Sequence, residues 1–339
     1  MASSVRHITS HFDASLSARV VETVSLRYRL GADAEQDRPA IVRAASGLDW
    51  TNRGGRTELA VVQDDASFIA FADPETGLCD AIALPRGDKG ARQFDSARGN
   101  KWAKPDFEAI VGINHGTRLL AFGSGSTLAR QKIAIVEIDS SPRVADAASF
   151  YETLRNNVAF AGSELNLEGA VCLNDGTLRL FQRGNGALRE DLCPIDATCD
   201  LALDELLRYL DDPTGREPTP RAQNIVAFDL GMIDGVRLTF TDGALGPSGL
   251  FYVAAAEASP NTVDDGPVAG CAIGRIDRDQ SARWAPLCNP MGGPLAVKAE
   301  GLAIDPRDPT IAYVVVDADD PHVPSALCRI ALEGPWTTG

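Results

Sequence analysis

Residues 104–127 read KPDFEAIVGINHGTRLLAFGSGST, in which Glu108 opens a run of apolar residues. Two apolar segments flank Asn114-His115-Gly116, a sequence typical of a β-hairpin turn because Asn and Gly tolerate positive φ. A carboxylate in a buried strand is costly unless it has partners. The stretch therefore predicts a hairpin whose first strand begins in a polar surrounding.

The same pattern recurs along the chain. LNLEGAVCLNDGTLRLFQRGNG (165–186) repeats it with Glu168, and VKAEGLAIDPRDPTIAYVVVDADD (297–320) repeats it with Glu300. Two weaker copies carry Ser46 or Asp49 (44–65) and Asp242 (240–259) in place of the glutamate. Further short strands follow each hairpin, so the repeating units start near residues 40, 104, 166, 241 and 297.

Units of three to four strands repeated along a chain are typical of a β-propeller. We expect an all-β propeller with five blades; six blades and an irregular β-sandwich are the alternatives. The last unit, 297–334, has three clear strands, and ETVSLRYRL (22–30) is expected to complete it and close the ring. The expected organisation is an N-terminal segment, 1–21, followed by one propeller domain, 22–335.

Two short helices are expected as insertions. ASFYETLRNN (148–157) precedes the third hairpin, and CDLALDELLRYLDD (199–212) places four leucines on one helical face. We expect the second helix to cover a blade edge, with a cap on the channel or a dimer contact as alternatives.

The bulk composition argues against several classes of partner and site. The 339 residues carry a formal charge of -15, which argues against nucleic acid or an anionic membrane as partner. The N-terminus lacks an apolar signal core, and no apolar run reaches the length of a membrane span, so a cytoplasmic protein is expected. The seven cysteines match no zinc spacing, and the four histidines argue against a histidine-based metal site or triad.

The glutamates are expected to converge. The first strand of each propeller blade lines the central channel, and residues two apart share a face, so Asp106 lies with Glu108, Asn166 with Glu168 and Lys298 with Glu300. Like charges this close repel unless a cation or basic side chains intervene. One hypothesis is a Ca²⁺ or Mg²⁺ site with oxygen ligands from Glu108, Asn166, Glu168, Asp242 and Glu300. The other is direct pairing with Lys104, Arg183 and Lys298.

The ends of the second strands are expected at the same mouth of the channel. They carry Ser124 and Ser126 in FGSGST, then Arg183, Glu257 and Asp317. Glycines beside Ser124 and Ser126 would let backbone N–H groups approach an anion, although the motif of a P-loop is missing. A water-filled polar channel without chemistry explains the same residues.

These segments resemble a family of uncharacterised bacterial propeller proteins over roughly 40–334. The resemblance rests on LNLEGAVCLNDGTLRLFQRGN (165–185), KPDFEAI (104–110), FGSGST (122–127), TFTDGALG (239–246), YVAAAE (252–257), DDGPVAGCAIGRID (264–277) and VKAEGLAIDP (297–306). The glutamate hairpins are more distantly similar to esterase-like phytase domains and calcium-dependent propeller lactonases. That likeness implies that Glu108, Glu168 and Glu300 line the channel and that Arg183 matches the basic residue after the second strand. The chain departs from the lactonase pattern in its Asn/Asp ligands and its lack of a channel histidine pair.

Two functions are expected from different classes. The first is binding of a small anionic or ester-containing metabolite, with metal-assisted hydrolysis in which Glu108, Glu168 and Glu300 act on the substrate. Ca²⁺ or Mg²⁺ would be the cofactor, with no organic cofactor, and Lys104, Ser124, Ser126, Arg183, Glu257, Lys298 and Asp317 would bind the ligand. The alternative is a non-catalytic scaffold for a partner protein. A homodimer is a further expectation.

Overall fold

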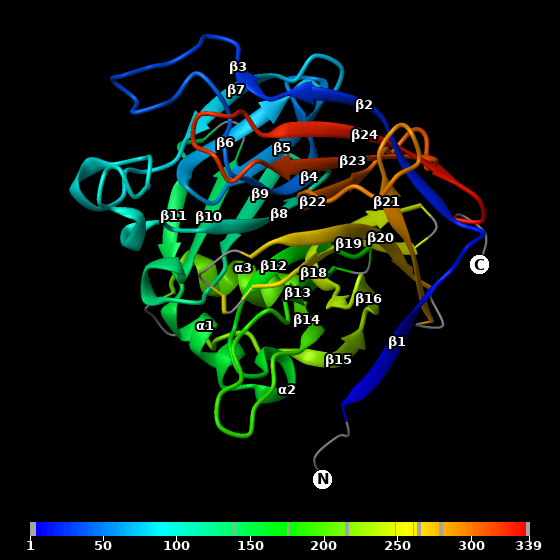
Figure 1. Ribbon diagram of the computed structural model, residues 1–339. Coiled ribbons are helices and arrows are strands. Elements are labelled where there is room, and N and C mark those ends of the chain that lie inside the picture. Colours follow the sequence, from blue (N-terminus) through cyan, green and yellow to red (C-terminus); the bar gives the residue numbers. More distant parts are fainter. Residues whose placement is uncertain are drawn as a thin grey trace.

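The structure is a computed structural model, and it describes residues 5–137, 140–174, 176–213, 217–247, 249–259, 261–262, 266–277 and 281–336. The chain is mostly β, and its antiparallel sheets are arranged around a central axis as a β-propeller (Figure 1). In the described residues no helix is long and apolar enough to cross a membrane.

Each unit is an antiparallel run of consecutive strands, as the repeat of hairpin sequences predicts. The first unit comprises β4 (Ala45–Arg53), β5 (Arg56–Gln63), β6 (Ala66–Ala72) and β7 (Leu78–Ala83). The second comprises β8 (Phe107–Ile113), β9 (Arg118–Gly123), β10 (Lys132–Glu137) and β11 (Arg143–Asp146). The third comprises β12 (Leu167–Cys172), β13 (Thr177–Gln182), β14 (Asp196–Ala202) and β15 (Gln223–Asp229). The remaining units comprise β18 (Thr239–Gly246), β19 (Gly249–Glu257), β20 (Val268–Ile276) and β21 (Ala282–Cys288); and β22 (Lys298–Ile304), β23 (Ile311–Asp317) and β24 (Ala326–Glu333). A small hairpin joins β16 (Met232–Ile233) to β17 (Val236–Arg237).

The first strands of the units surround the axis. β4 contacts β8, β8 contacts β12, β12 contacts β18, β18 contacts β22, and β22 contacts β4. Small residues make this crowding tolerable: a Cβ atom on Gly301 would lie 2.3 Å from the Ser46 carbonyl oxygen, and one on Gly169 would lie 2.9 Å from the Gly243 nitrogen. The predicted crowding at the axis is therefore present.

Each first strand also contains a register shift near its start. The extra residue is Glu108 in β8, Glu168 in β12 and Glu300 in β22, and the shift in β4 spans Ser46 and Gly47. In β18 the extra residue is Thr241, so the alignment of Asp242 with the glutamates was wrong by one position. A β-bulge redirects the side chain of the extra residue. The recurring glutamate is thus a bulge residue, which the sequence pattern did not reveal.

The N-terminal strands tie the last units together. β2 (Ser17–Ser25) pairs antiparallel with β24, and Figure 1 shows the two strands side by side. The strand expected at 22–30 therefore begins earlier and ends at Ser25, and β3 (Arg27–Tyr28) pairs with β7 instead. β1 (Arg6–Phe12) runs parallel to both β15 and β21. Residues 6–25 thus belong to the sheets.

The helices pack between the second and third units. α1 (Ala148–Arg155), α2 (Val158–Ala161) and α3 (Leu203–Asp211) contribute buried side chains to one apolar cluster with strands of both units. α3 is shorter than expected, because residues 199–202 continue β14. Leu206 and Leu210 of α3 are fully buried, so this helix covers the sheet edge. Three single-turn 3₁₀ helices lie in loops: η1 (Asp88–Gly90), η2 (Lys101–Ala103) and η3 (Leu128–Arg130).

Candidate functional site

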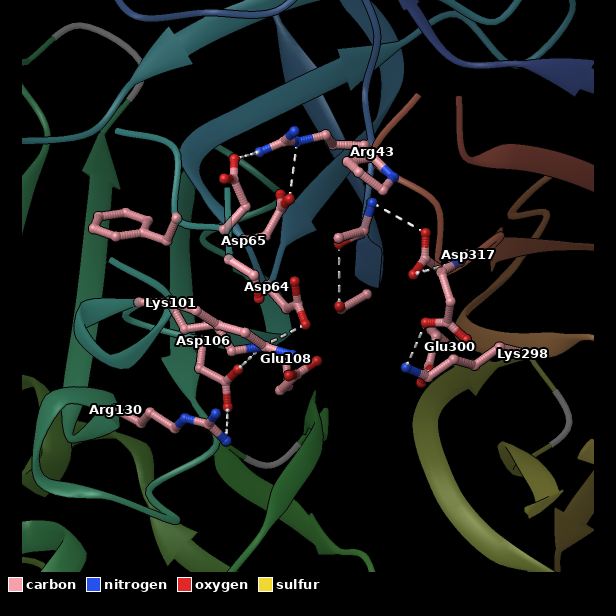
Figure 2. A pocket seen from close by; sticks show the side chains of 18 of the residues that line it. Arg43, Asp64, Asp65, Lys101, Asp106, Glu108, Arg130, Lys298, Glu300 and Asp317 are labelled. Atoms are coloured by element: carbon pink, nitrogen blue, oxygen red, sulfur yellow. Dashed lines mark hydrogen bonds and ion pairs between the residues drawn. The ribbon is translucent and has the colours of Figure 1, made fainter. Parts of the chain in front are cut away.

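A cavity of about 900 Å³ opens where the first strands begin and several second strands end. Glu108, Glu168 and Glu300 all line it, each carried there by the bulge of its strand. Figure 2 shows two facing groups of ionisable side chains, one with Asp64, Asp106, Glu108 and Arg130, the other with Lys298, Glu300 and Asp317. The convergence predicted from the hairpin repeat is present in the structure.

The remaining predicted site residues fall into three groups. Lining the cavity directly are Lys104, Asn166, Arg183, Lys298 and Asp317. Glu257 lies behind Arg183, and Ser124 is buried beneath Asp106, while Ser126 lines a second cavity. Asp242 is not among the residues that line either described cavity. The metal-binding role predicted for Asp242 and the catalytic and binding roles predicted for the other site residues stay predictions.

Asp106 is the centre of the first ion network. Its carboxylate lies 2.6 Å from Lys104 Nζ and 2.9 Å from Arg130 Nη1, and the Ser124 hydroxyl donates to it at 2.6 Å. Burial acts to raise the pKa of Asp106, but Lys104 and Arg130 overcome that effect and hold it below its usual value. Asp64 shares the same ammonium group, at 2.7 Å from Lys104 Nζ.

Arg183 organises the second network. Its guanidinium lies 2.6 Å from Glu257 Oε2 and 3.4 Å from Glu168 Oε1, and all three side chains are almost fully buried. The Asn166 amide donates to Glu168 Oε1 at 2.6 Å. Burial raises the pKa of Glu168 to about 8, although Arg183 acts in the opposite direction. Burial thus outweighs the effect of Arg183 on the Glu168 carboxyl.

Glu300 belongs to a third, looser network. Lys298 Nζ lies 3.6 Å from Glu300 Oε1 and 3.1 Å from Asp319 Oδ1. Burial raises the pKa of Glu300, with Lys298 opposing it. Nearby Asp317 accepts a hydrogen bond from the backbone N–H of Ala44, which joins the last unit to the first.

Glu108 differs from the other two glutamates. Within the described part of the chain it has neither an ion pair nor a hydrogen bond, although it faces the cavity. Burial and the neighbouring carboxylates of Asp106, Glu168 and Asp64 raise the pKa of Glu108 well above its usual range. One oxygen each of Asp64, Asp106 and Glu108 lie within 4.8 Å of one another. Glu108 thus adjoins two acids that both contact Lys104.

Asp242 serves the backbone rather than the cavity. Its carboxylate accepts the N–H groups of Gly243 at 2.7 Å and Leu302 at 2.9 Å, so it links β18 to β22. Asp49 of β4 makes the same kind of contact, because it accepts the N–H of Gly112 in β8 at 2.7 Å. These contacts explain why an acid recurs one or more positions after the bulge in units that lack the glutamate.

Sequence reasoning missed several cavity residues. Asp64, Asp65, Arg43 and Arg130 line the cavity, and none was among the predicted site residues. Asp64 and Asp65 follow the second strand of the first unit, as Asp317 lies at the end of the second strand of the last. The rule that identified Asp317 would therefore have found them. The loops that bring Arg43 and Arg130 carry no such signal.

The fold and this cavity define a β-propeller with ionisable side chains at one mouth of its axis. Residues 41–332 match the model of the family of unknown function DUF6929, and the chain belongs to that family. The family resemblance inferred from the glutamate hairpins is thereby confirmed. No curated protein matches the chain in sequence.

Solved structures share the general shape at low identity. Myxococcus xanthus glutaminyl cyclase is 10% identical, with a TM-score of 0.46 over 97% of this chain and 99% of the other. A glycosyl hydrolase from Bacteroides ovatus is 9% identical, with a TM-score of 0.47 over 94% and 93%. The gluconolactonase XC5397 from Xanthomonas campestris is 11% identical, with a TM-score of 0.41 over 86% and 87%. Likeness of this degree says nothing about activity.

Proposed function

We propose that the chain binds a small polar metabolite in the cavity at the channel mouth and hydrolyses an ester-type bond in it. Glu108 donates a proton to the leaving oxygen, and Asp64 accepts a proton from the attacking water. The proposal rests on a single observation: a cavity-facing glutamate without an ion pair, next to a carboxylate that has one. Two neighbouring carboxyl groups in different protonation states are a recurring arrangement for acid–base catalysis.

The other cavity residues have supporting roles in this proposal. Lys104 and Arg130 hold Asp106, and Asp106 in turn keeps Glu108 protonated. Lys298 and Arg183 are already paired with acids, and acidic side chains outnumber basic ones along the cavity. We therefore favour an uncharged or hydroxyl-rich group beside Glu108. We also propose that the ring of first strands has five blades, with β2 as the outer strand of the last.

The test is a panel of aryl esters, lactones, phosphoesters and glycosides, assayed with the wild type and Glu108→Gln. Glutamine keeps the shape of the side chain and removes the acid. We expect Glu108→Gln to lower kcat by about 10²–10⁴ for any substrate that the wild type hydrolyses. Glu152→Gln on the exposed face of α1 is the matched control and should leave kcat unchanged. Equal rates in the wild type and Glu108→Gln would remove Glu108 from the mechanism.

A divalent cation is the second candidate, favoured by the carboxylates of Asp64, Asp106 and Glu108 within 4.8 Å of one another. Hard oxygen ligands suit Ca²⁺ or Mg²⁺, which would polarise the carbonyl or phosphoryl oxygen of a bound substrate. Of the metal ligands expected from the sequence, only Glu108 belongs to this set. Glu168 and Glu300 have basic partners instead, and Asp242 accepts backbone N–H groups. For a cation to bind there, Lys104 would have to leave both Asp64 and Asp106, which also pairs with Arg130.

Cation binding is tested by the melting temperature of chelator-treated protein with added Ca²⁺ or Mg²⁺. A cation that binds only the folded state raises the melting temperature. A rise in the wild type that is absent in Glu108→Gln would support the cation site. If added cation raises the melting temperature of neither protein and the wild type still hydrolyses a substrate, the acid–base mechanism without a metal is supported. Neither a cation effect nor hydrolysis would favour the non-catalytic scaffold.

A further inference from the structure

A second cavity, of about 470 Å³, lies next to the first. Asn261 and Thr262 line both cavities, so the two are neighbours across one short loop segment. Ser126 lines the second cavity, and its hydroxyl accepts a hydrogen bond from Arg130, which lines the first. The two cavities are therefore placed to hold two parts of one elongated ligand.

The second cavity differs from the first in charge. Its charged lining residues are Arg155, Arg189 and Glu164. Glu164 pairs with Arg189 and also accepts the backbone N–H of Ala187, so its charge is matched. Arg155 remains as a positive charge in excess, whereas acids outnumber bases in the first cavity.

Two side chains that line the second cavity have hydrogen-bond donors without a partner among the described residues. Arg155 donates one N–H to the Gly125 carbonyl at 2.7 Å, which fixes the guanidinium at the cavity wall and leaves further donors without a partner among the described residues. The Ser163 hydroxyl is buried and likewise has no hydrogen-bond partner there. A buried hydroxyl without a partner costs free energy that a ligand can recover. Thr127 and Thr262 add further hydroxyl groups.

We propose that the second cavity is a subsite for an anionic group, a phosphate or a carboxylate, at one end of the metabolite whose other end lies at Glu108. Arg155 and the hydroxyl of Ser163 bind the anion. This inference rests on the proposed function for the identity of the metabolite. It defines the substrate class: an elongated molecule with an anionic terminus and a hydrolysable bond near its uncharged end.

The test uses inorganic phosphate and acetate as probes on protein freed of metal by a chelating resin, with affinity measured by titration calorimetry. Phosphate binding with weaker acetate binding indicates a phosphorylated substrate, and the reverse indicates a carboxylate. We expect Arg155→Gln to weaken the affinity for the preferred anion about tenfold or more, because it removes a charge-assisted hydrogen bond. Arg208→Gln, on the exposed side of α3, is the matched control and should retain wild-type affinity.

Ser163→Ala keeps the inference falsifiable if Arg155→Gln does not fold. Because the hydroxyl has no partner, its removal should not lower the melting temperature, while anion affinity should fall a few-fold. Glu108→Gln should retain anion binding, so a failure of the catalytic proposal is separable from a failure of this one. The inference is overturned if neither anion binds, if Arg155→Gln and Ser163→Ala both bind normally, or if Glu108→Gln abolishes binding.

Discussion

Three bulge glutamates enter one cavity, yet their surroundings give them different chemistry. Arg183 and Asn166 contact Glu168, and Lys298 lies beside Glu300, whereas burial and neighbouring carboxyl groups outweigh the opposing charge of Lys104 at Glu108. A buried acid beside like charges avoids ionisation by keeping its proton. Position in the repeat therefore brings the glutamates together, and the neighbours from other strands decide which of them can act as an acid.

Stability should depend on pH in an unusual direction. Burial raises the pKa of Glu168 to about 8, of Asp65 to about 8 and of Asp317 to about 7. Between roughly pH 4 and these values the folded protein binds more protons than the unfolded chain, so the free energy of unfolding falls as pH rises. We expect the melting temperature to fall by several degrees from pH 5 to pH 9 at constant ionic strength.

A calorimetric pH series checks this expectation, and Glu108→Gln should flatten part of the slope because it removes one of the raised groups. A melting temperature that does not fall from pH 5 to pH 9 would contradict the raised pKa values of these carboxyl groups, because groups with the same pKa in the folded and unfolded states add no pH dependence.

Asp106 should be the most sensitive residue of the cavity wall to substitution. Its side chain is 1% exposed and holds both Lys104 and Arg130. Asp106→Asn leaves two buried cations short of a counter-charge, which we expect to cost about 3–5 kcal/mol of unfolding free energy. Asp146→Asn breaks the exposed ion pair with Lys132 and should cost about 1 kcal/mol or less. Denaturant unfolding gives both values, and similar losses for the two variants would contradict the account.

At the scale of elements, the bulge is the feature that joins fold and site. It re-aims one residue at the start of each first strand, and the small residue that follows lets neighbouring first strands approach. The sequence predicted the hairpins, the crowding and the convergence of the three glutamates. It could not predict the bulge, because period-two alternation assumes an unbroken register. The one-residue error that put Asp242 in place of Thr241 follows directly.

Gly301 tests the close approach of first strands. A Cβ atom there would lie 2.3 Å from the Ser46 carbonyl oxygen and 2.9 Å from Leu48 Cβ, so backbone must move. We expect Gly301→Ala to lower the free energy of unfolding by about 3 kcal/mol or more, or to prevent folding. Gly270→Ala meets only the side chain of Ile233, at 3.1 Å, and should cost far less. Chemical denaturation measures the free energy of unfolding of both variants. Equal losses for Gly301→Ala and Gly270→Ala would contradict the close approach of the first strands.

On the scale of the whole molecule, the N-terminal strands complete the sheets. β2 covers the edge of β24, and β1 joins the third unit to the fourth. A closing strand was expected from the three-stranded last unit. Its start was misplaced, because residues 17–21 were assigned to a separate segment and the role of β1 was not foreseen. The sequence also could not predict which loops line the cavity. Arg43 and Arg130 reach it from loops whose positions depend on how the units close into a ring.

Ring closure by β2 predicts how shortened chains behave. A chain that begins at residue 14 loses β1 and keeps β2, so it should fold with a lowered melting temperature. A chain that begins at residue 27 exposes the edge of β24 and should aggregate or melt more than about 10 °C lower, because unpaired strand edges associate. Circular dichroism and size-exclusion chromatography distinguish these outcomes. A monomeric, stable chain without residues 1–26 would contradict closure by β2.

The protonation state of Glu108 tests the central claim most directly. Carbon-13 NMR of protein labelled at the glutamate side-chain carboxyl carbon measures it, and the signal lost in Glu108→Gln assigns the group. We predict that this carboxyl is still protonated at neutral pH and ionises only at higher pH. A Glu108 signal that titrates in the usual range of an exposed glutamate would contradict its role as the proton donor of the cavity.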